Sequence, residues 1–443
     1  MALRDWKLSR REMLRCAGLG WGASCASWLP ALAAEVAADP RRHRHCILLW
    51  MNGGPSQTDT FDMKPGHANG GEFKEIATRA PGLRFSEHLP KLAEHAERLA
   101  VVRSLSTKEG DHSRGTHLVR TGHPPAGGVA YPSIACALAK QLATASSKLP
   151  NYVSVAPQSQ VSPASFGPGF LGQRYAPAIV GGAAGGAASA ASDSAEIVDL
   201  RLEHIEWPAG VEARQAARRM ELWNELQGSF LRDHRGESFL AHDALYRNAA
   251  DMMRPEVRQA FDLGAESDTV RRKYGAGSFG QGCLLARRLV ERGVPFVEVA
   301  LGQGLAWDTH QDNFNQVRRL SEELDAGWAN LMTELAERGL LESTTILWIG
   351  EFGRTPTING NAGRDHFPSA WTCVFGGGGI QGGQAFGKTS DDGNVVEENR
   401  VEIGDVLATL CAAMGVSPSE ENVTPAARPI KLAEGKPISD ILA

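Results

Sequence analysis

The sequence lacks the cysteine pattern of a cross-linked or zinc-finger-like fold. Among its seven cysteines there is no Cys-x-x-Cys pair, and those beyond the N-terminal segment are odd in number and widely spaced. This excludes a disulfide framework and a zinc knuckle. We expect these cysteines to be small buried hydrophobic residues. They are Cys46, Cys136, Cys283, Cys373 and Cys411.

A strong excess of one charge is also lacking. The chain carries 46 basic and 51 acidic residues, for a net charge of −5, and no basic run alternates with aromatic residues beyond the N-terminal segment. Binding to nucleic acid or to an anionic membrane surface is therefore not expected. With 443 residues, of which 42% are hydrophobic and 22% charged, the composition is typical of a soluble globular protein.

Residues 1–34 have the pattern of an export signal. A basic stretch precedes the uncharged, small-residue-rich "CAGLGWGASCASWLPALA", which is too short and too rich in glycine to span a membrane as a helix. Arg10 and Arg11, in "SRREMLR", resemble the paired arginines of twin-arginine signals. We therefore expect transport by the twin-arginine export machinery and a periplasmic or extracellular location. Lipidation at Cys25 is less favoured, because Gly22 stands where leucine is usual.

Alternating helical and extended patterns predict an α/β fold. Apolar residues recur at helical spacing in residues 278–293 and 314–339, and each of these segments precedes an apolar run, at 295–301 and 344–350. This order forms a βαβ unit, which requires a parallel sheet with helices on its faces. We predict one doubly wound, mostly parallel domain over residues 43–443. Further strands are expected at 45–51, 98–105 and 151–156, and a short helix capped by Ser113 is expected to end at Gly122.

Two segments are expected to lie outside the sheet. Residues 181–194 consist almost entirely of glycine, alanine and serine, which predicts a flexible loop. Residues 212–271 have helical spacing and predict an insertion of two or three helices, which would suit a small cap over the sheet.

Polar residues follow three of the predicted strands. Because loops converge at the carboxyl ends of parallel strands, these residues are expected to meet at one edge of the sheet. Their oxygen and nitrogen donors suit Zn, Mn, Mg or Ca, and two such ions could clamp a phosphate or sulfate ester. The candidates are Asn52 and Asp59; Asp308 and His310 within "WDTHQD"; and Glu351, Arg354, Asp365 and His366.

Each of these motifs also has a simpler interpretation. Asp308 or Thr309 suits the N-cap of the helix that follows. Glu351 and Arg354 have the spacing of a structural ion pair. Residues 52–62 suit a turn. A functional site is favoured by the coincidence of all three motifs at one edge, not by any of them alone.

Long motifs carry a family resemblance. "LLWMNGGPSQTDTFDMKPG", "WDTHQDNF", "GEFGRTPTINGNAGRDHFP" and "GGGGIQGGQAFGKTSDDG" occur in an order that resembles the bacterial family called domain of unknown function 1501, from about residue 46 to the C-terminal segment. That family looks like a branch of the alkaline phosphatase and sulfatase superfamily. The resemblance implies an alkaline phosphatase-like fold, divalent metal ions, and hydrolysis of phosphate or sulfate esters of small molecules or glycans.

The resemblance also implies roles for residues. Asp308, His310, Glu351, Asp365 and His366 would be metal ligands, with Asn52 at the position of the superfamily's first aspartate and Asp59 a further candidate, and Arg354 would hold the substrate anion. Phe352 stands where a metal-binding histidine is usual. Counting back ten residues from Gly122 to the usual nucleophile position reaches His112, with the hydroxyl groups of Ser113 and Thr107 nearby, so the nucleophile stays open. The alternative is a non-catalytic exported protein that keeps the fold for binding or for a structural role.

Overall fold

The computed structural model describes residues 44–125, 127–143, 148–181, 196–203, 205–207, 210–234 and 236–443. The predicted export signal with Arg10 and Arg11 lies outside these residues, as does nearly all of the predicted 181–194 loop. Among the described helices, none combines the length and apolar character needed to cross a membrane.

An eight-stranded sheet forms the centre of the fold, with the strand order β12-β4-β11-β8-β1-β7-β5-β6. Its strands are β1 (His45–Met51), β4 (Leu99–Leu105), β5 (Tyr152–Val155), β6 (Ala178–Val180), β7 (Phe296–Leu301), β8 (Thr344–Gly350), β11 (Trp371–Gly377) and β12 (Gln384–Phe386). Neighbouring strands run parallel except at β11, which is antiparallel to both β8 and β4. The predicted mostly parallel α/β fold is confirmed.

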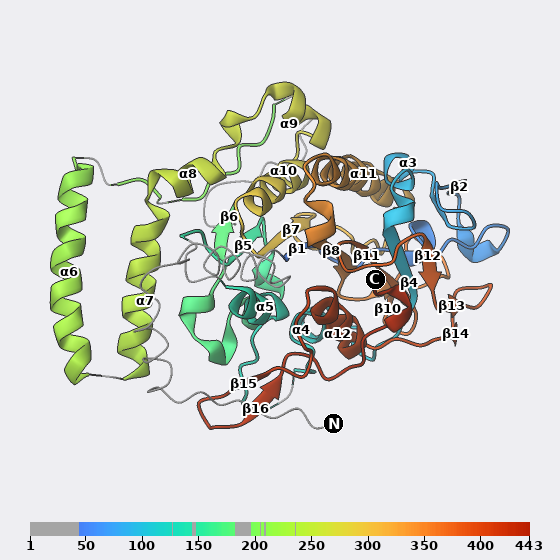
Figure 1. Cartoon of the computed structure of the whole chain (residues 1–443). Coiled ribbons are helices and arrows are strands. Elements are labelled where there is room, and N and C mark those ends of the chain that lie inside the picture. The colour runs from blue at the N-terminus through green and yellow to red at the C-terminus, as the bar shows by residue number, and fades with distance from the viewer. Residues whose placement is uncertain are drawn as a thin grey trace, which may run out of the picture. The chain divides into compact units, whose positions relative to one another are not determined.

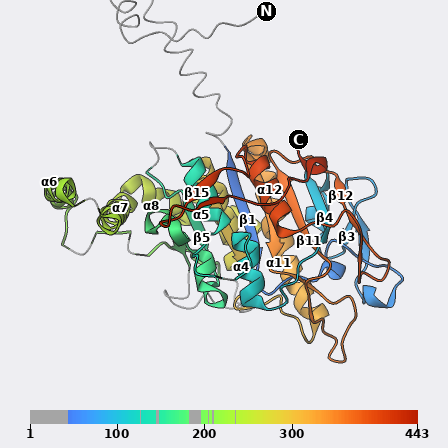
Figure 2. The same cartoon turned by 90° about the horizontal axis from the view of Figure 1, so that it is seen from below.

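The first strand of the chain lies in the interior of this sheet (Figure 2). Alternate residues of β1 contribute to two separate hydrophobic cores: Ile47 and Leu49 to one, Leu48 and Trp50 to the other. A strand buried on both faces needs apolar residues at every position, because successive side chains point to opposite faces. This explains the unbroken apolar run at 45–51.

Helices cover both faces of the sheet (Figure 1). One core includes residues of α3 (Pro90–Ala93), α10 (Ser278–Glu291) and α11 (Asn313–Glu337), and the other includes residues of α4 (His112–Thr121), α5 (Ile134–Leu142) and α12 (Ile403–Ala413). Three helices lie wholly within residues 212–271, and a fourth begins there: α6 (Ala213–Asp233), α7 (Glu237–Met252) and α8 (Pro255–Phe261), followed by α9 (Asp268–Tyr274).

Four two-stranded sheets complete the described part of the chain. They pair β2 (Glu75–Ala77) with β3 (Arg84–Ser86), β9 (Gly353–Arg354) with β10 (His366–Phe367), β13 (Lys388–Thr389) with β14 (Val396–Glu398), and β15 (Glu421–Val423) with β16 (Pro429–Lys431). The β9–β10 pair matters most for function, because it carries residues of the predicted site.

Helix α4 begins earlier than predicted. Asp111 is its N-cap, and its side chain accepts a hydrogen bond from the backbone N–H of Arg114 at 3.0 Å. The predicted cap, Ser113, lies within the first turn, so that prediction is wrong: the aspartate two residues earlier has the extended backbone that a cap requires. The helix ends at Gly122, which has a φ of +76°, as predicted.

Candidate metal centre

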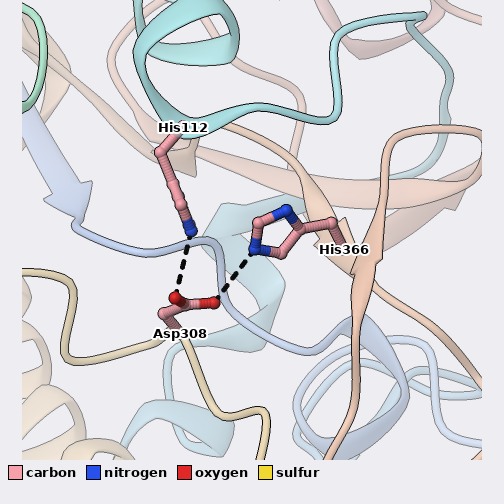
Figure 3. A group of neighbouring side chains, drawn as sticks. All are labelled: His112, Asp308 and His366. Carbon is pink, nitrogen blue, oxygen red and sulfur yellow. Dashed lines mark hydrogen bonds and ion pairs between the residues drawn. The ribbon is translucent and has the colours of Figure 1, made fainter.

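Side chains from three distant segments meet at the carboxyl edge of the sheet (Figure 3). His112 is the first residue of α4, Asp308 lies between β7 and α11, and His366 lies on β10. The ligating atoms of these three residues lie within 4.8 Å of one another. A fourth side chain joins them, since His310 Nε2 is 3.1 Å from Asp308 Oδ1 and 3.0 Å from His366 Nε2.

Each of the three histidines is held through its Nδ1 atom. With that atom bonded to an oxygen, Nε2 is the atom left to face Asp308. Histidines that bind metal ions characteristically show this arrangement, because the outer acceptor fixes the ring and its tautomer. The three contacts, each of 2.7 Å, join His112 to Glu351 Oε1, His310 to Asp365 Oδ1 and His366 to the carbonyl of Gly110.

Charge concentrates on Asp308. Burial opposes its ionisation, but the close contacts with His112 and His366 and the charge of Arg354 hold the pKa of this carboxyl far below its usual range. Burial likewise lowers the pKa of His112, yet its contacts with Asp308 and Glu351 outweigh burial and raise that pKa to about 9. Asp308 is therefore anionic throughout the physiological pH range.

The residues fit a divalent ion. His112 Nε2 is buried and lies 3.2 Å from Asp308 Oδ2 without the geometry of a hydrogen bond. The side chains of Asp308, His366 and His310 are 22%, 28% and 44% exposed, so an ion can reach them from solvent. Imidazole and carboxylate donors of this kind suit zinc, and also manganese.

Two glycines allow the loops to come together at this site. Gly53 follows β1 with a φ of +106°, and a Cβ there would lie 2.6 Å from the backbone nitrogen of Asp308. At Gly363 a Cβ would lie 1.9 Å from the carbonyl oxygen of His310. Both positions therefore require glycine for close backbone packing.

The segment 351–368 is built around the β9–β10 pair. Arg354 lies opposite His366 in this pair. Within the connecting segment, the Asn359 side chain donates to the His310 carbonyl at 3.0 Å and accepts from the backbone of Gly363 at 3.0 Å. The segment that carries Asp365 and His366 is thus fixed against the segment that carries His310.

Most of the chain matches one family. The family model described as "Protein of unknown function (DUF1501)" covers residues 43–442. The chain belongs to the DUF1501 family. The predicted membership is confirmed. A search of curated proteins found no match to the sequence.

Among solved structures, the DUF1501 chain is similar to several at low identity. "Ps i-CgsB" is 11% identical, with 89% of this chain and 75% of that chain covered and a TM-score of 0.43. An alkaline phosphatase superfamily protein from Vibrio parahaemolyticus is 11% identical, with 91% and 71% covered and a TM-score of 0.39. The PsFucS1 sulfatase from Pseudoalteromonas sp. is 13% identical, with 89% and 72% covered and a TM-score of 0.37.

Arg354 differs from its predicted role. It is fully buried, and its guanidinium donates to the carbonyls of Gly53 and Gly54 and pairs with Asp308 at 2.6 Å. These contacts occupy the group that was expected to hold a substrate anion. Glu351 in turn accepts from the backbone of Gly53 at 2.9 Å and contacts His112, so the expected pair between Glu351 and Arg354 is not the one that forms.

Two predicted ligands of the DUF1501 chain lie apart from the cluster. Asp59 forms a buried two-point ion pair with Arg364, at 2.7 and 2.9 Å, and also accepts from Asn313 at 2.8 Å. The side chain of Asn52 donates to the Gly302 carbonyl at 3.0 Å. The Asp59 carboxylate is thus occupied by protein partners, which indicates a scaffold role for Asp59, whereas only the amide nitrogen of Asn52 is bonded in this way.

Neither candidate nucleophile contacts the cluster. Ser113 is exposed, and within the described residues its hydroxyl has no hydrogen-bond partner. The hydroxyl of Thr107 lies 3.5 Å from the Pro368 carbonyl. No described hydroxyl group is hydrogen-bonded to His112, Asp308 or either of the other two histidines, so the structure gives no activated serine or threonine at this site.

Phe352 forms the apolar rear wall of the site. It is fully buried, and its ring centroid lies 4.9 Å from that of His112 and 4.8 Å from that of His366. At the position where the resemblance implied a further histidine ligand, this DUF1501 chain therefore has a hydrophobic ring. The grouped donor atoms of His112, Asp308 and His366 could hold one ion.

The simpler interpretation of "WDTH" as a helix cap is wrong. The N-cap of α11 is Asp312, with a φ of +49°, and not Asp308 or Thr309. The hydroxyl of Thr309 instead donates to the Asn313 side chain at 2.6 Å. Asp308 is therefore free of a capping role and faces the histidines.

Proposed function

We propose that this DUF1501 protein is an exported, divalent-metal-dependent hydrolase of phosphate or sulfate esters. The observation that carries the proposal is the convergence of three histidine Nε2 atoms on Asp308, with every Nδ1 held by an oxygen. In metal sites, each histidine typically bonds to an oxygen through one ring nitrogen, which leaves the other nitrogen to bind the ion. The ester class rests on the family resemblance.

The ligands of the ion would be His112, Asp308, His310 and His366. A divalent ion held there supplies Lewis-acid polarisation of an ester oxygen. Glu351, Gly110 and Asp365 orient the three rings, and Phe352 excludes water from the rear of the site. Since neither Ser113 nor Thr107 contacts the cluster, we propose water as the attacking group: its oxygen bonds to phosphorus or sulfur, and the alcohol leaves.

One observation favours a second candidate, a non-catalytic binding protein. Arg354 is buried and bonded to backbone carbonyls, so it offers no free N–H groups to the anionic part of an ester. Ester hydrolysis needs the developing negative charge to be stabilised. In this candidate the ion would only bind an anionic glycan or a partner.

Metal analysis is the first test. We expect about one equivalent of a divalent ion in the purified mature protein, and a large loss in Asp308→Asn, because the ion loses its only carboxylate among the four donors. Asp312→Asn is the matched control: Asp312 is exposed in the same segment, and asparagine tolerates its left-handed backbone. Wild-type protein without a stoichiometric ion after incubation with Zn, Mn, Mg or Ca would refute the metal centre.

Turnover then separates the two candidates. Aryl phosphates and aryl sulfates should be hydrolysed by wild-type and Asp312→Asn protein but not by Asp308→Asn. A protein that binds one ion and hydrolyses neither ester class is the binding protein of the second candidate.

A further inference from the structure

A second polar cavity lies outside the metal centre. Its volume is about 510 Å³, and its walls come from residues 62–67, from β4 through Arg103, and from residues 387–391 at β13. None of these residues belongs to the four donors of the metal centre. The proposed hydrolase function does not use this cavity.

Arg103 is the unusual residue of this cavity. It interrupts the otherwise buried strand β4, where its neighbours Val102 and Ser104 are fully buried. Its Nε donates to the Phe61 carbonyl at 3.0 Å, and its side chain is 24% exposed. Among the described residues the two terminal nitrogens of its guanidinium have no hydrogen-bond partner. Strand β4 thus holds a planar guanidinium whose two terminal nitrogens remain available to a ligand.

Within the described part of the chain, Arg103, unlike Lys64, has no carboxylate within hydrogen-bond distance. Lys64 Nζ lies 3.1 Å from Asp62 Oδ1 and 2.6 Å from the Thr389 hydroxyl, which donates to Asp62 Oδ2 at 2.5 Å. The side chains of Lys64 and Asp62 are only 9% and 4% exposed. Lys64 and Thr389 therefore satisfy Asp62, and Arg103 Nε, 3.7 Å from Oδ1, is only a secondary partner.

The rim moderates this positive charge. Lys388 lines the cavity but pairs with Glu397 at 2.9 Å, and the carboxylate of Asp391 lines it as well. An anion can therefore bind at Arg103, but the negative charge of Asp391 would repel it. Affinity for a small anion should be weak and should depend on Asp391.

We propose that this cavity binds an oxyanion group, a sulfate, phosphate or carboxylate, through the free guanidinium edge of Arg103. A planar fork of this kind donates two parallel hydrogen bonds to two oxygens of such a group. The site does not depend on the metal centre, so it stands whether or not the protein is a hydrolase.

Isothermal titration with sodium sulfate, sodium phosphate and sodium acetate, at constant ionic strength set by chloride, tests the site. We expect saturable binding of at least one anion, weakened about tenfold or more in Arg103→Gln because two charge-assisted bonds are lost. Asp391→Asn should tighten binding several-fold. Arg98→Gln, an exposed arginine just before β4, and Asp308→Asn should bind as wild type. The acetate arm separates a carboxylate site from a site for tetrahedral anions.

Two results would overturn the site: wild-type protein that fails to saturate with any of the three anions, or Arg103→Gln that binds as tightly as wild type. If circular dichroism shows that Arg103→Gln does not fold, Asp391→Asn decides, because an unchanged affinity there also rejects the site. Loss of binding in Asp308→Asn, with binding retained in Arg103→Gln, would place the anion at the metal centre instead.

Discussion

At the scale of single residues, the role of each histidine is set by the acceptor at its Nδ1 atom. Glu351 is buried, and it holds His112 while also accepting from the backbone of Gly53. It contacts Nδ1 of His112 and not the donor atoms of the cluster, so we expect an orienting role where the family resemblance implied a ligand.

Substituting Glu351 tests this orienting role. We expect Glu351→Gln to weaken zinc or manganese binding about 10- to 100-fold, because the ring of His112 loses the anion that fixes its tautomer. Competition with a chromogenic chelator measures the affinity. Glu342→Gln, at a side chain that is 81% exposed, is the control and should bind as wild type. An unchanged affinity in Glu351→Gln would reject the role.

The sequence predicted several site residues and misassigned others for a physical reason. Asp308 and His366 were predicted as ligands and lie in the cluster. Asp59 and Arg354 were equally plausible from their positions, but Arg364 and the carbonyls of Gly53 and Gly54 occupy them. Which polar groups are free depends on partners far along the chain, and no local pattern encodes those partners.

At the scale of elements, the connection between β9 and β10 carries Asp365 and leads into His366 at the candidate metal centre. Its backbone packs so closely on His310 that residue 363 has no room for a side chain. The element functions as a rigid support, fixed by Asn359.

A single methyl group should therefore disturb the site. We expect Gly363→Ala to cost about 1–3 kcal/mol of stability, as overpacking typically does, and to weaken metal binding. Gly360→Ala is a control in the same segment, since a Cβ there meets nothing within 4 Å. Urea unfolding and metal titration measure both effects, and identical behaviour of the two variants would contradict the close packing.

Helix α4, which presents His112, is fixed to the sheet by a buried ion pair. Arg120 near the end of the helix meets Glu298 of β7 at 2.5 Å, and the two side chains are 2% and 0% exposed. Tyr152 of β5 donates to the same carboxylate at 2.5 Å. The pair links the helix to two strands.

Removing one partner of this pair should be costly. We expect Glu298→Ala to lower the free energy of unfolding by about 3–5 kcal/mol, because the charge of Arg120 would stay buried without a partner. Glu94→Ala, which breaks the exposed pair between Arg79 and Glu94, should cost less than about 1 kcal/mol. Urea unfolding of both variants measures the difference. Equal losses in the free energy of unfolding would show that Arg120 finds another partner when Glu298 is removed.

At the scale of the whole molecule, the ion position joins segments that are distant along the chain: α4, the β7–α11 connection and β10. An ion there binds the folded chain and not the unfolded one. It should therefore stabilise the fold as a whole.

Thermal unfolding with and without metal tests this coupling. At a free ion concentration 100 times the Kd, stability should rise by about 2.7 kcal/mol, which raises Tm, and a chelator should reverse the rise. Asp308→Asn should unfold at the same temperature in both conditions. A metal-induced rise in Tm of equal size in that variant would show that the ion binds elsewhere.

The sequence alone determined the fold class, because strands buried on both faces need unbroken apolar runs and helices need their own spacing, and both are local patterns. It did not reveal β6, β11 or β12, which are short or glycine-rich, nor the antiparallel direction of β11. Only the tertiary structure decided which polar residues form the site. His112 faces Asp308, and Arg103 keeps a free edge, because of how distant loops and strands pack, and that packing is a property of the whole chain.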